Sequence, residues 1–191
     1  MVFDFDGTLV DTMPLHYEAY RRTFAEAHLE LTPEDFYGNI GGSARETIPR
    51  FLRGRSCARS VQELHARKKE IVAELFATAE VPRLATAMLL PLLHRRIKLA
   101  LASSGSRPGI ELLLTRLDWV RYFDVVVTGE DAARGKPAPD LFLLAARGLD
   151  LDPARCLAFE DTDDGVAAAE AAGMTVFDVR RAVAPGGSTP R

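Results

Sequence analysis

The chain has 191 residues, 47% of them hydrophobic and 27% charged, which is the balance of an ordinary globular domain with room for a modest insertion. Its 24 basic and 27 acidic residues give a net charge of −3, which argues against binding a nucleic acid or a membrane surface through bulk charge. Met1 leads directly into an expected strand, so no signal peptide is predicted, and the longest apolar run, at 85–93, is too short to span a bilayer. The two cysteines lack metal spacing and are expected to be reduced. These features predict a cytoplasmic protein, with a monomer favoured.

Residues 2–12 begin as a buried strand that ends in acidic residues. Apolar residues alternate with Asp4 and Asp6, and side chains two apart on a strand point to the same face, so the two carboxylates are expected to lie side by side. Gly7 then permits a sharp turn, and the hydroxyl of Thr8 follows at once. Taken alone, such a pair is more commonly two solvated acids at a strand end. It suits catalysis where a cation joins the carboxylates or where one of them keeps its proton.

Residues 13–85 show helical spacing of apolar side chains and no alternating strand pattern. Thr32, followed by a proline and two acids, is typical of a helix start. A Gly-Gly-Ser run at 41–43 interrupts the pattern, and further helices are predicted over 45–52 and 61–76. We therefore expect a small all-helical domain, inserted after the first strand.

Strands and helices alternate in the rest of the chain. Strands are predicted over 97–102, 123–127, 156–159 and 174–179, and helices over 108–117, 139–149 and 163–172, the last closed by Gly173. This alternation implies βαβ units and predicts an α/β fold, a doubly wound parallel sheet covered by helices on both faces. The core domain is expected to comprise 1–12 and 86–181, with the helical domain at 13–85, a break or late helix start at Pro91 and a flexible tail at 182–191.

Residues suited to binding a metal and a phosphate follow the predicted strands. In a doubly wound sheet, ligands bind beyond the carboxyl ends of the strands. These ends carry Asp4 and Asp6, Ser103 and Ser104, and Glu160 and Asp161, and Lys136 lies between the third and fourth strands. Carboxylate oxygens suit Mg²⁺, whereas a lysine, a hydroxyl and turn N–H groups suit phosphate oxygens. Taken singly, the serines are more often a turn and helix cap, the lysine a solvated charge, and the acid pair the start of a helix. Their order along the chain and their shared edge of the sheet favour one site.

Four motifs thus stand in order along the chain: Asp4-Phe5-Asp6-Gly7-Thr8, Ser103, Lys136 and Glu160-Asp161. They resemble the four signature motifs of the haloacid dehalogenase (HAD) superfamily of phosphotransferases, and the resemblance covers roughly 2–180. The helical insertion looks like the small cap of that family. The most similar branch is that of β-phosphoglucomutase and the fructose-1-phosphatase-like sugar-phosphate phosphatases. The resemblance implies a Rossmann-like core, a Mg²⁺ cofactor and a small phosphorylated metabolite as substrate.

The resemblance also assigns a role to each motif residue. Asp4 would be the nucleophile that forms an aspartyl phosphate, and Asp6 would be the general acid and then the general base. Asp4 and Asp161 would hold Mg²⁺, with Glu160 bound directly or through water and Asp6 contributing its backbone carbonyl. Phosphate oxygens would be bound by Thr8, Ser103, Ser104 and Lys136.

In related enzymes, residues that face the substrate lie where this chain has His16, Arg45 and Lys68. From the residues alone, His16 is as readily a plain histidine on a helix surface, and Arg45, just after the Gly-Gly-Ser run, favours an anion contact. Lys68 stands between two other basic residues, and such helix faces are usually solvated. The segments at 11–12 and 82–83 bracket the insertion and are expected to be hinges for cap closure.

The sequence predicts a Mg²⁺-dependent phosphatase acting on a small sugar phosphate or a similar metabolite. One alternative is a mutase of the β-phosphoglucomutase kind, in which the aspartyl phosphate returns to the sugar rather than to water, and the motifs are common to both. Another is a regulatory phospho-binding module on a flavodoxin-like sheet, phosphorylated on an acid without turnover. Asp6 argues against that module, because a carboxylate two residues after the nucleophile supplies acid–base turnover.

Overall fold

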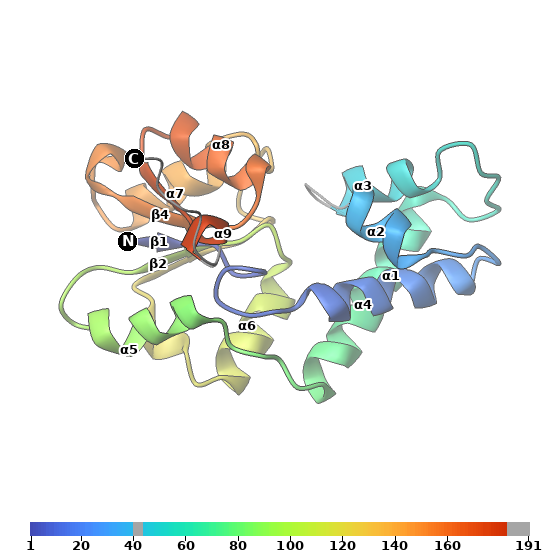
Figure 1. Cartoon of the computed structure of the whole chain (residues 1–191), viewed down its shortest axis with the longest axis horizontal. Coiled ribbons are helices and arrows are strands. Elements are labelled where there is room, and N and C mark those ends of the chain that lie inside the picture. Colours follow the sequence, from blue (N-terminus) through green and yellow to red (C-terminus); the bar gives the residue numbers. More distant parts are fainter. Residues whose placement is uncertain (40–43, 183–191) are drawn as a thin grey trace, which may run out of the picture.

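The structure, a computed structural model, describes residues 1–39 and 44–182. Its strands are β1 Val2–Phe3, β2 Ala100–Ala102, β3 Val125–Val127, β4 Leu157–Glu160 and β5 Thr175–Asp178. Its α-helices are α1 Met13–Ala25, α2 Pro33–Asn39, α3 Ala44–Phe51, α4 Val61–Thr78, α5 Leu89–Leu93, α6 Arg107–Arg116, α7 Asp140–Gly148, α8 Asp163–Ala171 and α9 Val179–Ala182. We call α1 to α4 the helical unit, and the remaining described elements the sheet unit (Figure 1). Over the described ranges, no helix combines the length and the apolar character needed to cross a membrane.

The five strands form one parallel sheet in the order β3-β2-β1-β4-β5, which confirms the predicted α/β class. The chain moves outward from β1 to β2 and β3, then returns to place β4 on the other side of β1. In such a sheet the strand order reverses between β1 and β4, and ligands bind at the carboxyl ends beside this point. Phe3 pairs in register with Phe159, so the residues that follow these two strands are neighbours. The helical unit stands at this carboxyl edge (Figure 1).

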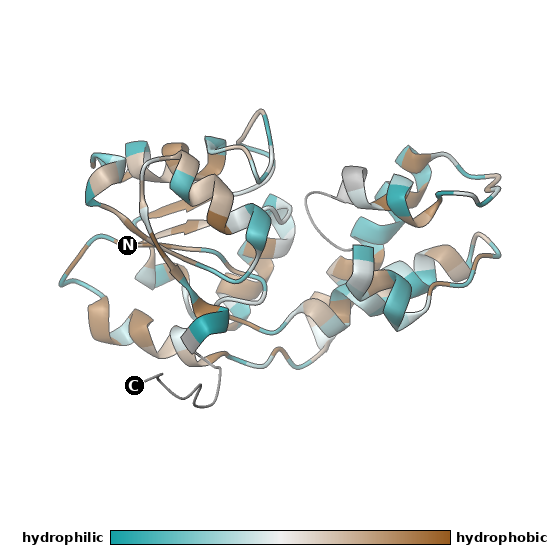
Figure 2. Ribbon diagram, turned by 45° about the horizontal axis from the view of Figure 1, so that its top comes forward, coloured by the Kyte–Doolittle hydropathy of each residue, from teal (hydrophilic) through white to brown (hydrophobic). Residues whose placement is uncertain are grey.

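Both faces of the sheet are buried, and each carries side chains of a different size. Phe3, Leu101 and Phe159 point into one hydrophobic cluster, which α5, α6 and the end of α4 cover. Val2 and Ala158 point into the other, where α7 and α8 approach closely over small side chains. The rings of Phe3 and Phe159 stack with centroids 4.6 Å apart. The two strands buried on both faces at the centre of the sheet, β1 and β2, are accordingly apolar throughout (Figure 2). β5, at the edge of the sheet, is partly exposed and carries Thr175 and Asp178.

The helical unit has an aromatic core of its own. Tyr20 and Phe51 meet edge to face with ring centroids 5.2 Å apart, and Phe36 packs beside them. Thr32 begins α2 as predicted, because its hydroxyl accepts the Asp35 N–H while the Asp35 carboxylate accepts the Thr32 N–H. The predicted interruption at 41–43 lies outside the described residues.

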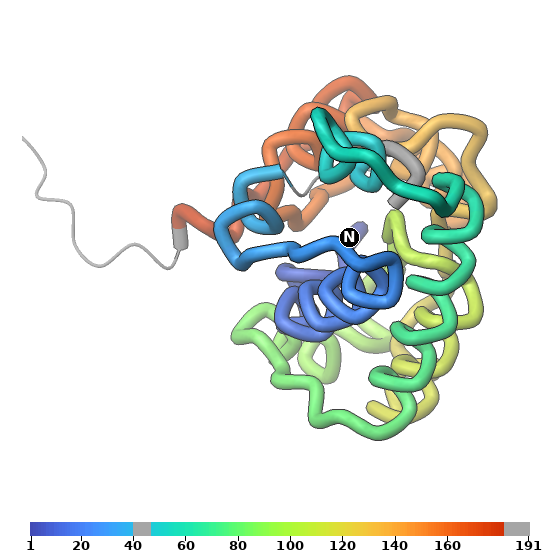
Figure 3. Tube along the Cα trace, turned by 90° about the vertical axis from the view of Figure 1, so that its right-hand side faces the viewer, coloured from blue at the N-terminus to red at the C-terminus, as the bar shows by residue number. Residues whose placement is uncertain are grey.

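Two backbone segments connect the helical unit to the sheet unit, and they lie side by side. The Asp11 N–H donates to the Pro82 carbonyl and the Leu84 N–H to the Leu9 carbonyl, both at 2.9 Å. The end of α4 also contacts the sheet unit, because Arg116 on α6 donates to the Ala79 carbonyl at 3.1 Å. α4 and α6 therefore run next to each other (Figure 3). The predicted domain boundaries and hinges stay predictions.

Several predicted element ends were wrong by a few residues. β2 begins at Ala100 rather than at Ile97, which is 41% exposed, because an apolar run does not show where pairing with a neighbouring strand starts. The last strand ends at Asp178, and α9 follows it into the stretch predicted as tail; residues 183–191 lie outside the described part. The break at Pro91 is confirmed, because a 3₁₀ turn precedes the short α5. Proline is the third residue of α5, within the first turn, where a backbone N–H has no hydrogen-bond partner inside the helix, so its missing N–H costs no helical bond.

Gly129, just after β3, gives the first test of this packing. A Cβ on Gly129 would lie 2.5 Å from the carbonyl oxygen of Ser104, so Gly129→Ala must displace the turn after β2. We expect a loss of about 1–3 kcal/mol in the free energy of unfolding, measured by urea denaturation. Gly135→Ala is the matched control, because a Cβ there meets nothing within 4 Å. Equal stability of the two variants would contradict the close approach.

Candidate active site

A buried lysine joins two carboxylates at the carboxyl edge of the sheet. The register of β1 with β4 places Asp4, whose N–H donates to the Phe159 carbonyl at 3.0 Å, beside Glu160. Lys136 reaches between them, and its Nζ lies 2.5 Å from Asp4 Oδ1 and 2.5 Å from Glu160 Oε1. A third bond, of 3.1 Å, goes to the Ala102 carbonyl at the end of β2. Three predicted site residues thus form one charged centre.

The charges of this centre shift the pKa values of its members. Burial alone would lower the pKa of Lys136, but the charges of Asp4 and Glu160 outweigh it and raise that pKa, so the lysine stays protonated. Burial, together with the carboxylates of Glu160 and Asp161, raises the pKa of Asp4 well above its usual value against the opposing effect of Lys136. A further cation would favour the ionised carboxylate, which a nucleophile requires.

The turn after β1 packs directly against Asp161. Gly7 has a φ of +86°, and a Cβ on it would lie 2.1 Å from Asp161 Oδ2, so this position requires glycine for both its backbone and its space. The Thr8 hydroxyl donates to Asp161 Oδ1 at 3.1 Å, whereas its predicted contact with phosphate stays a prediction. Burial and the charge of Glu160 raise the pKa of Asp161 to about 6.

Asp4, Glu160 and Asp161 form a set of donors that fits a hard divalent cation. Each offers a carboxylate oxygen, and these oxygens lie within 4.8 Å of one another. All-oxygen donors with excess negative charge suit Mg²⁺. Glu160 accepts the most hydrogen bonds of the three, because its Oε2 already accepts the N–H of Asp161 and both the N–H and the hydroxyl of Thr162. Asp4 and Asp161 are therefore the freer ligands.

Asp6 has a separate set of partners and no contact with Lys136 among the described bonds. Its Oδ1 accepts the Thr12 hydroxyl and lies 3.4 Å from His16 Nε2, and its Oδ2 lies 3.4 Å from the Ser103 hydroxyl. Burial would raise the pKa of Asp6, but the hydrogen bonds from His16 and Thr12 and the charge of Lys68 lower it overall. The carboxylate is accordingly ionised in this state.

Two of the three predicted cap residues meet at Asp6. Lys68 Nζ lies 3.2 Å from His16 Nδ1, and Nε2 of the same ring faces Asp6. Burial and the charge of Lys68 lower the pKa of His16, so the ring is neutral. A protonated lysine can only donate, so Nδ1 accepts and Nε2 carries the proton toward Asp6. The side chain of Arg45 lies outside the described part of the chain.

The remaining predicted residue, Ser104, and one residue that the sequence did not reveal, Thr12, lie nearby. Ser103 and Ser104 occupy the turn after β2, where the Ser103 hydroxyl also accepts the Gly105 N–H at 2.9 Å. Thr12 precedes α1, but its buried hydroxyl makes no cap hydrogen bond and donates to Asp6 instead. A threonine before a helix looks like an ordinary N-cap in sequence, which hid its role.

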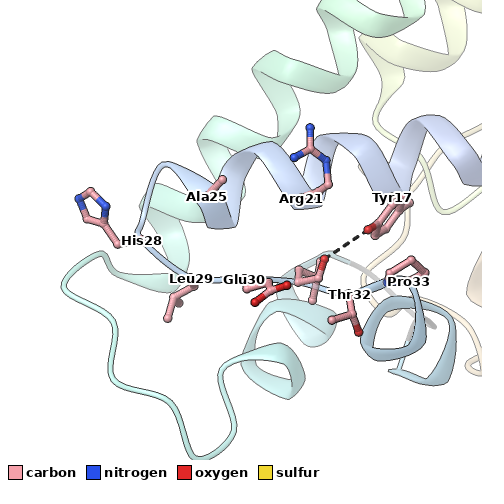
Figure 4. A pocket seen from close by; sticks show the side chains of 9 residues that line it. Tyr17, Arg21, Ala25, His28, Leu29, Glu30, Thr32 and Pro33 are labelled. Atoms are coloured by element: carbon pink, nitrogen blue, oxygen red, sulfur yellow. Dashed lines mark hydrogen bonds between the residues drawn. The ribbon is translucent and has the colours of Figure 1, made fainter.

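A pocket of about 430 Å³ lies elsewhere, on the helical unit. Figure 4 shows it between α1 and the segment leading to α2, where the Tyr17 hydroxyl donates to the Leu31 carbonyl. Its other polar lining includes Arg21 and Glu30, and none of the predicted site residues whose side chains the structure describes lines it. The convergence of charged groups at the sheet edge, rather than this hollow, marks the candidate active site.

Known proteins are similar to this chain along nearly its whole length. A family model described as haloacid dehalogenase-like hydrolase matches residues 1–179. The phosphorylated carbohydrates phosphatase of Thermotoga maritima is 37% identical over 179 residues, covering 91% of this chain and 81% of its own. The fructose-1-phosphate phosphatase YqaB of Escherichia coli is 31% identical over 180 residues, covering 94% and 95%. The crystal structure of CbbY from Rhodobacter sphaeroides in complex with phosphate matches with a TM-score of 0.83 and 32% identity, covering 92% of this chain and 83% of that one.

The buried charge of Lys68 predicts a stability effect. Burial lowers the pKa of Lys68 to about 8, so below pH 8 the fold carries the cost of a protonated, desolvated lysine. Lys68→Met should raise the free energy of unfolding by about 1–3 kcal/mol at pH 7 in urea denaturation. Between pH 8 and about 10.5 the folded state releases this proton while the unfolded state keeps it, so the wild type gains stability and the difference shrinks.

Lys69→Met is the matched control, because Lys69 is the next residue on α4 and is 43% exposed. We expect Lys69→Met to change stability by less than about 0.5 kcal/mol at pH 7. A Lys68→Met variant less stable than the wild type at pH 7 would contradict the buried charge.

Proposed function

The chain belongs to the haloacid dehalogenase-like hydrolase family and is a phosphoric monoester hydrolase, and we propose that it hydrolyses a small sugar phosphate through an aspartyl phosphate on Asp4. The observation that carries this proposal is the separation of the two aspartates. Asp4 belongs to the charged centre around Lys136. Asp6 instead contacts two hydroxyl groups and a histidine of the helical unit. This separation supports a division of roles in which Asp4 attacks phosphorus and Asp6 transfers the proton.

The first half-reaction needs a nucleophile and an acid. A carboxylate oxygen of Asp4 forms a bond to phosphorus as the bond from phosphorus to the sugar oxygen breaks, and Asp6 donates a proton to that leaving oxygen. Asp6 is ionised without ligand, and the negative charge of a bound phosphate would raise its pKa and favour the protonated acid. In this proposal Lys136 and the Ser103 hydroxyl bind the phosphoryl oxygens, with Lys136 exchanging one of its present partners for the phosphoryl group.

The second half-reaction uses the same two residues. Asp6, now ionised, takes a proton from a water molecule as the water oxygen attacks phosphorus. The bond between phosphorus and Asp4 breaks, which releases phosphate and restores the carboxylate. The hydrogen bonds from Thr12 and His16 favour the ionised Asp6 at this stage.

We propose Mg²⁺ as the cofactor, held by Asp4 and Asp161 with Glu160 direct or through water. The raised pKa values of Asp4 and Asp161 support it, because both come from burial and mutual repulsion that a cation would relieve. When bound, the ion neutralises negative charge on the phosphoryl group and on its carboxylate ligands.

The proposed substrate class rests on the relatives and on the helical unit. The relatives are named as phosphatases of phosphorylated carbohydrates and of fructose 1-phosphate. His16 places a ring nitrogen next to Asp6, where the oxygen of a leaving sugar would lie, and Lys68 adds an ammonium group on the other side of that ring. Such donors suit sugar hydroxyls better than an apolar leaving group.

Substitution of the two aspartates tests the chemistry, with p-nitrophenyl phosphate and Mg²⁺ as reagents. Asp4→Asn should lose phosphate release by at least about 10³-fold and form no phosphoenzyme, because an amide cannot attack. Asp6→Asn should release close to one p-nitrophenol per enzyme and then stall, since this leaving group needs no acid but the attacking water needs a base.

Asp11→Asn, in the same segment, is the control and should keep wild-type turnover.

A panel of phosphorylated metabolites, assayed with Mg²⁺ and a bisphosphate primer, then separates the proposed functions. Phosphate release from sugar phosphates supports the proposal, and its absence across the panel would sink it. Conversion of β-glucose 1-phosphate to the 6-phosphate would establish the mutase, and a phosphorylated but inert protein the regulatory module.

The metal proposal has a separate test. Asp161→Asn should raise the Mg²⁺ concentration for half-maximal activity by at least about tenfold, whereas Asp163→Asn, whose side chain is 92% exposed, should not. In the wild type this concentration should rise as the pH falls below about 6, because a proton then competes for Asp161. Full activity in excess chelator would refute a metal requirement.

A further inference from the structure

An ion pair on the surface joins the helical unit to the sheet unit. Lys69 Nζ on α4 lies 3.0 Å from Glu130 Oε1 in the loop after β3, and the two side chains are 43% and 48% exposed. Of the ion pairs between described residues, only this one and the His16–Asp6 contact in the active site cross from one unit to the other. The pair is therefore a candidate for setting how the two units fit together.

Besides the apolar packing of its end, two polar contacts hold helix α4 against the sheet unit. Near its end, Arg116 donates to the carbonyl of Ala79, and ten residues earlier, roughly 15 Å along a helix, stands Lys69. Lys68 is the neighbouring residue, and its side chain points to the active site rather than to the surface. Fixing Lys69 to the sheet unit therefore fixes the position from which Lys68 reaches His16.

We propose that the Lys69–Glu130 pair is a positioning pair, which holds α4 in the arrangement where Lys68 contacts His16 and His16 contacts Asp6. The inference rests on the proposed function, because it assigns the pair a part in binding the sugar phosphate. Neither residue touches substrate. The pair raises the fraction of molecules whose helical unit already stands in the binding-competent position, and apparent affinity scales with that fraction.

The exposure of the pair sets the size and the salt dependence of its effect. Solvent-exposed ion pairs are worth little in energy, so a change of about three- to fivefold in KM is expected rather than loss of activity. Salt screens the attraction between exposed charges, and the Debye length falls from about 10 Å at 0.1 M salt to a few ångströms at about 0.5 M. The effect should therefore fade as salt is added.

The test compares three variants: Glu130→Gln, Lys69→Met, and a double variant that exchanges the two charges (Lys69→Glu together with Glu130→Lys). The substrate is the sugar phosphate that the wild type hydrolyses fastest. Each single variant should raise KM about three- to fivefold with kcat within about twofold, because saturating substrate holds the units together. The exchange should bring KM back to within about twofold of the wild type. In 0.5 M NaCl the ratio of KM between Glu130→Gln and the wild type should fall toward one.

Glu26→Gln is the matched control, because Glu26 pairs with Arg67 and Arg59 inside the helical unit, and its KM should not change. An unchanged KM in Glu130→Gln, or an exchange variant no better than the single ones, overturns the inference and leaves the proposed function standing. A wild type that hydrolyses no sugar phosphate overturns the proposed function and this inference with it.

Discussion

The site depends on one buried ammonium group shared between two carboxylates. Asp4 and Glu160 become neighbours only because β1 and β4 pair in register at the centre of the sheet, and without a cation their charges would repel in a nearly dry environment. Lys136 supplies that cation from the segment before α7. The same centre still holds more negative than positive charge once Asp161 is counted, so the fold keeps Asp4, the proposed nucleophile, in place and leaves a negative charge that a metal ion would neutralise.

Two aspartates two residues apart therefore experience different electrostatic surroundings. Asp4 lies among carboxylates, and its pKa is raised by burial and their repulsion. Asp6 faces donors, and hydrogen bonds from a second part of the molecule lower its pKa. Dividing the pair in this way gives each a separate chemical task. It also makes Asp6, the proposed acid–base residue, sensitive to the position of the helical unit, because His16 and Lys68 come from α1 and α4.

The sequence predicted what depends on local pattern and on strand order. Apolar runs followed by polar residues located the strands and the residues at their ends, although Ile97 and Val179 fell outside strands because pairing, not hydropathy, sets those limits. It could not predict which of three consecutive basic residues on α4 is buried, since that depends on how the helix is rotated against the sheet unit. Lys68 turns inward and Lys69 outward. Thr12 was expected only as part of a hinge, and its hydrogen bond to Asp6 was not predicted, because that partner is fixed by tertiary structure.

The paired connecting segments have a consequence for how such a chain can change. Leu9 and Leu84 are joined by a backbone hydrogen bond. The two ends of the long helical insertion therefore lie as close together as the two ends of a short hairpin. The entropy of closing a loop grows only slowly with its length, and insertions succeed where chain ends lie close together. The helices between these points can therefore lengthen, shrink or be exchanged with little disturbance to the sheet, which frees specificity to vary while the charged centre stays the same.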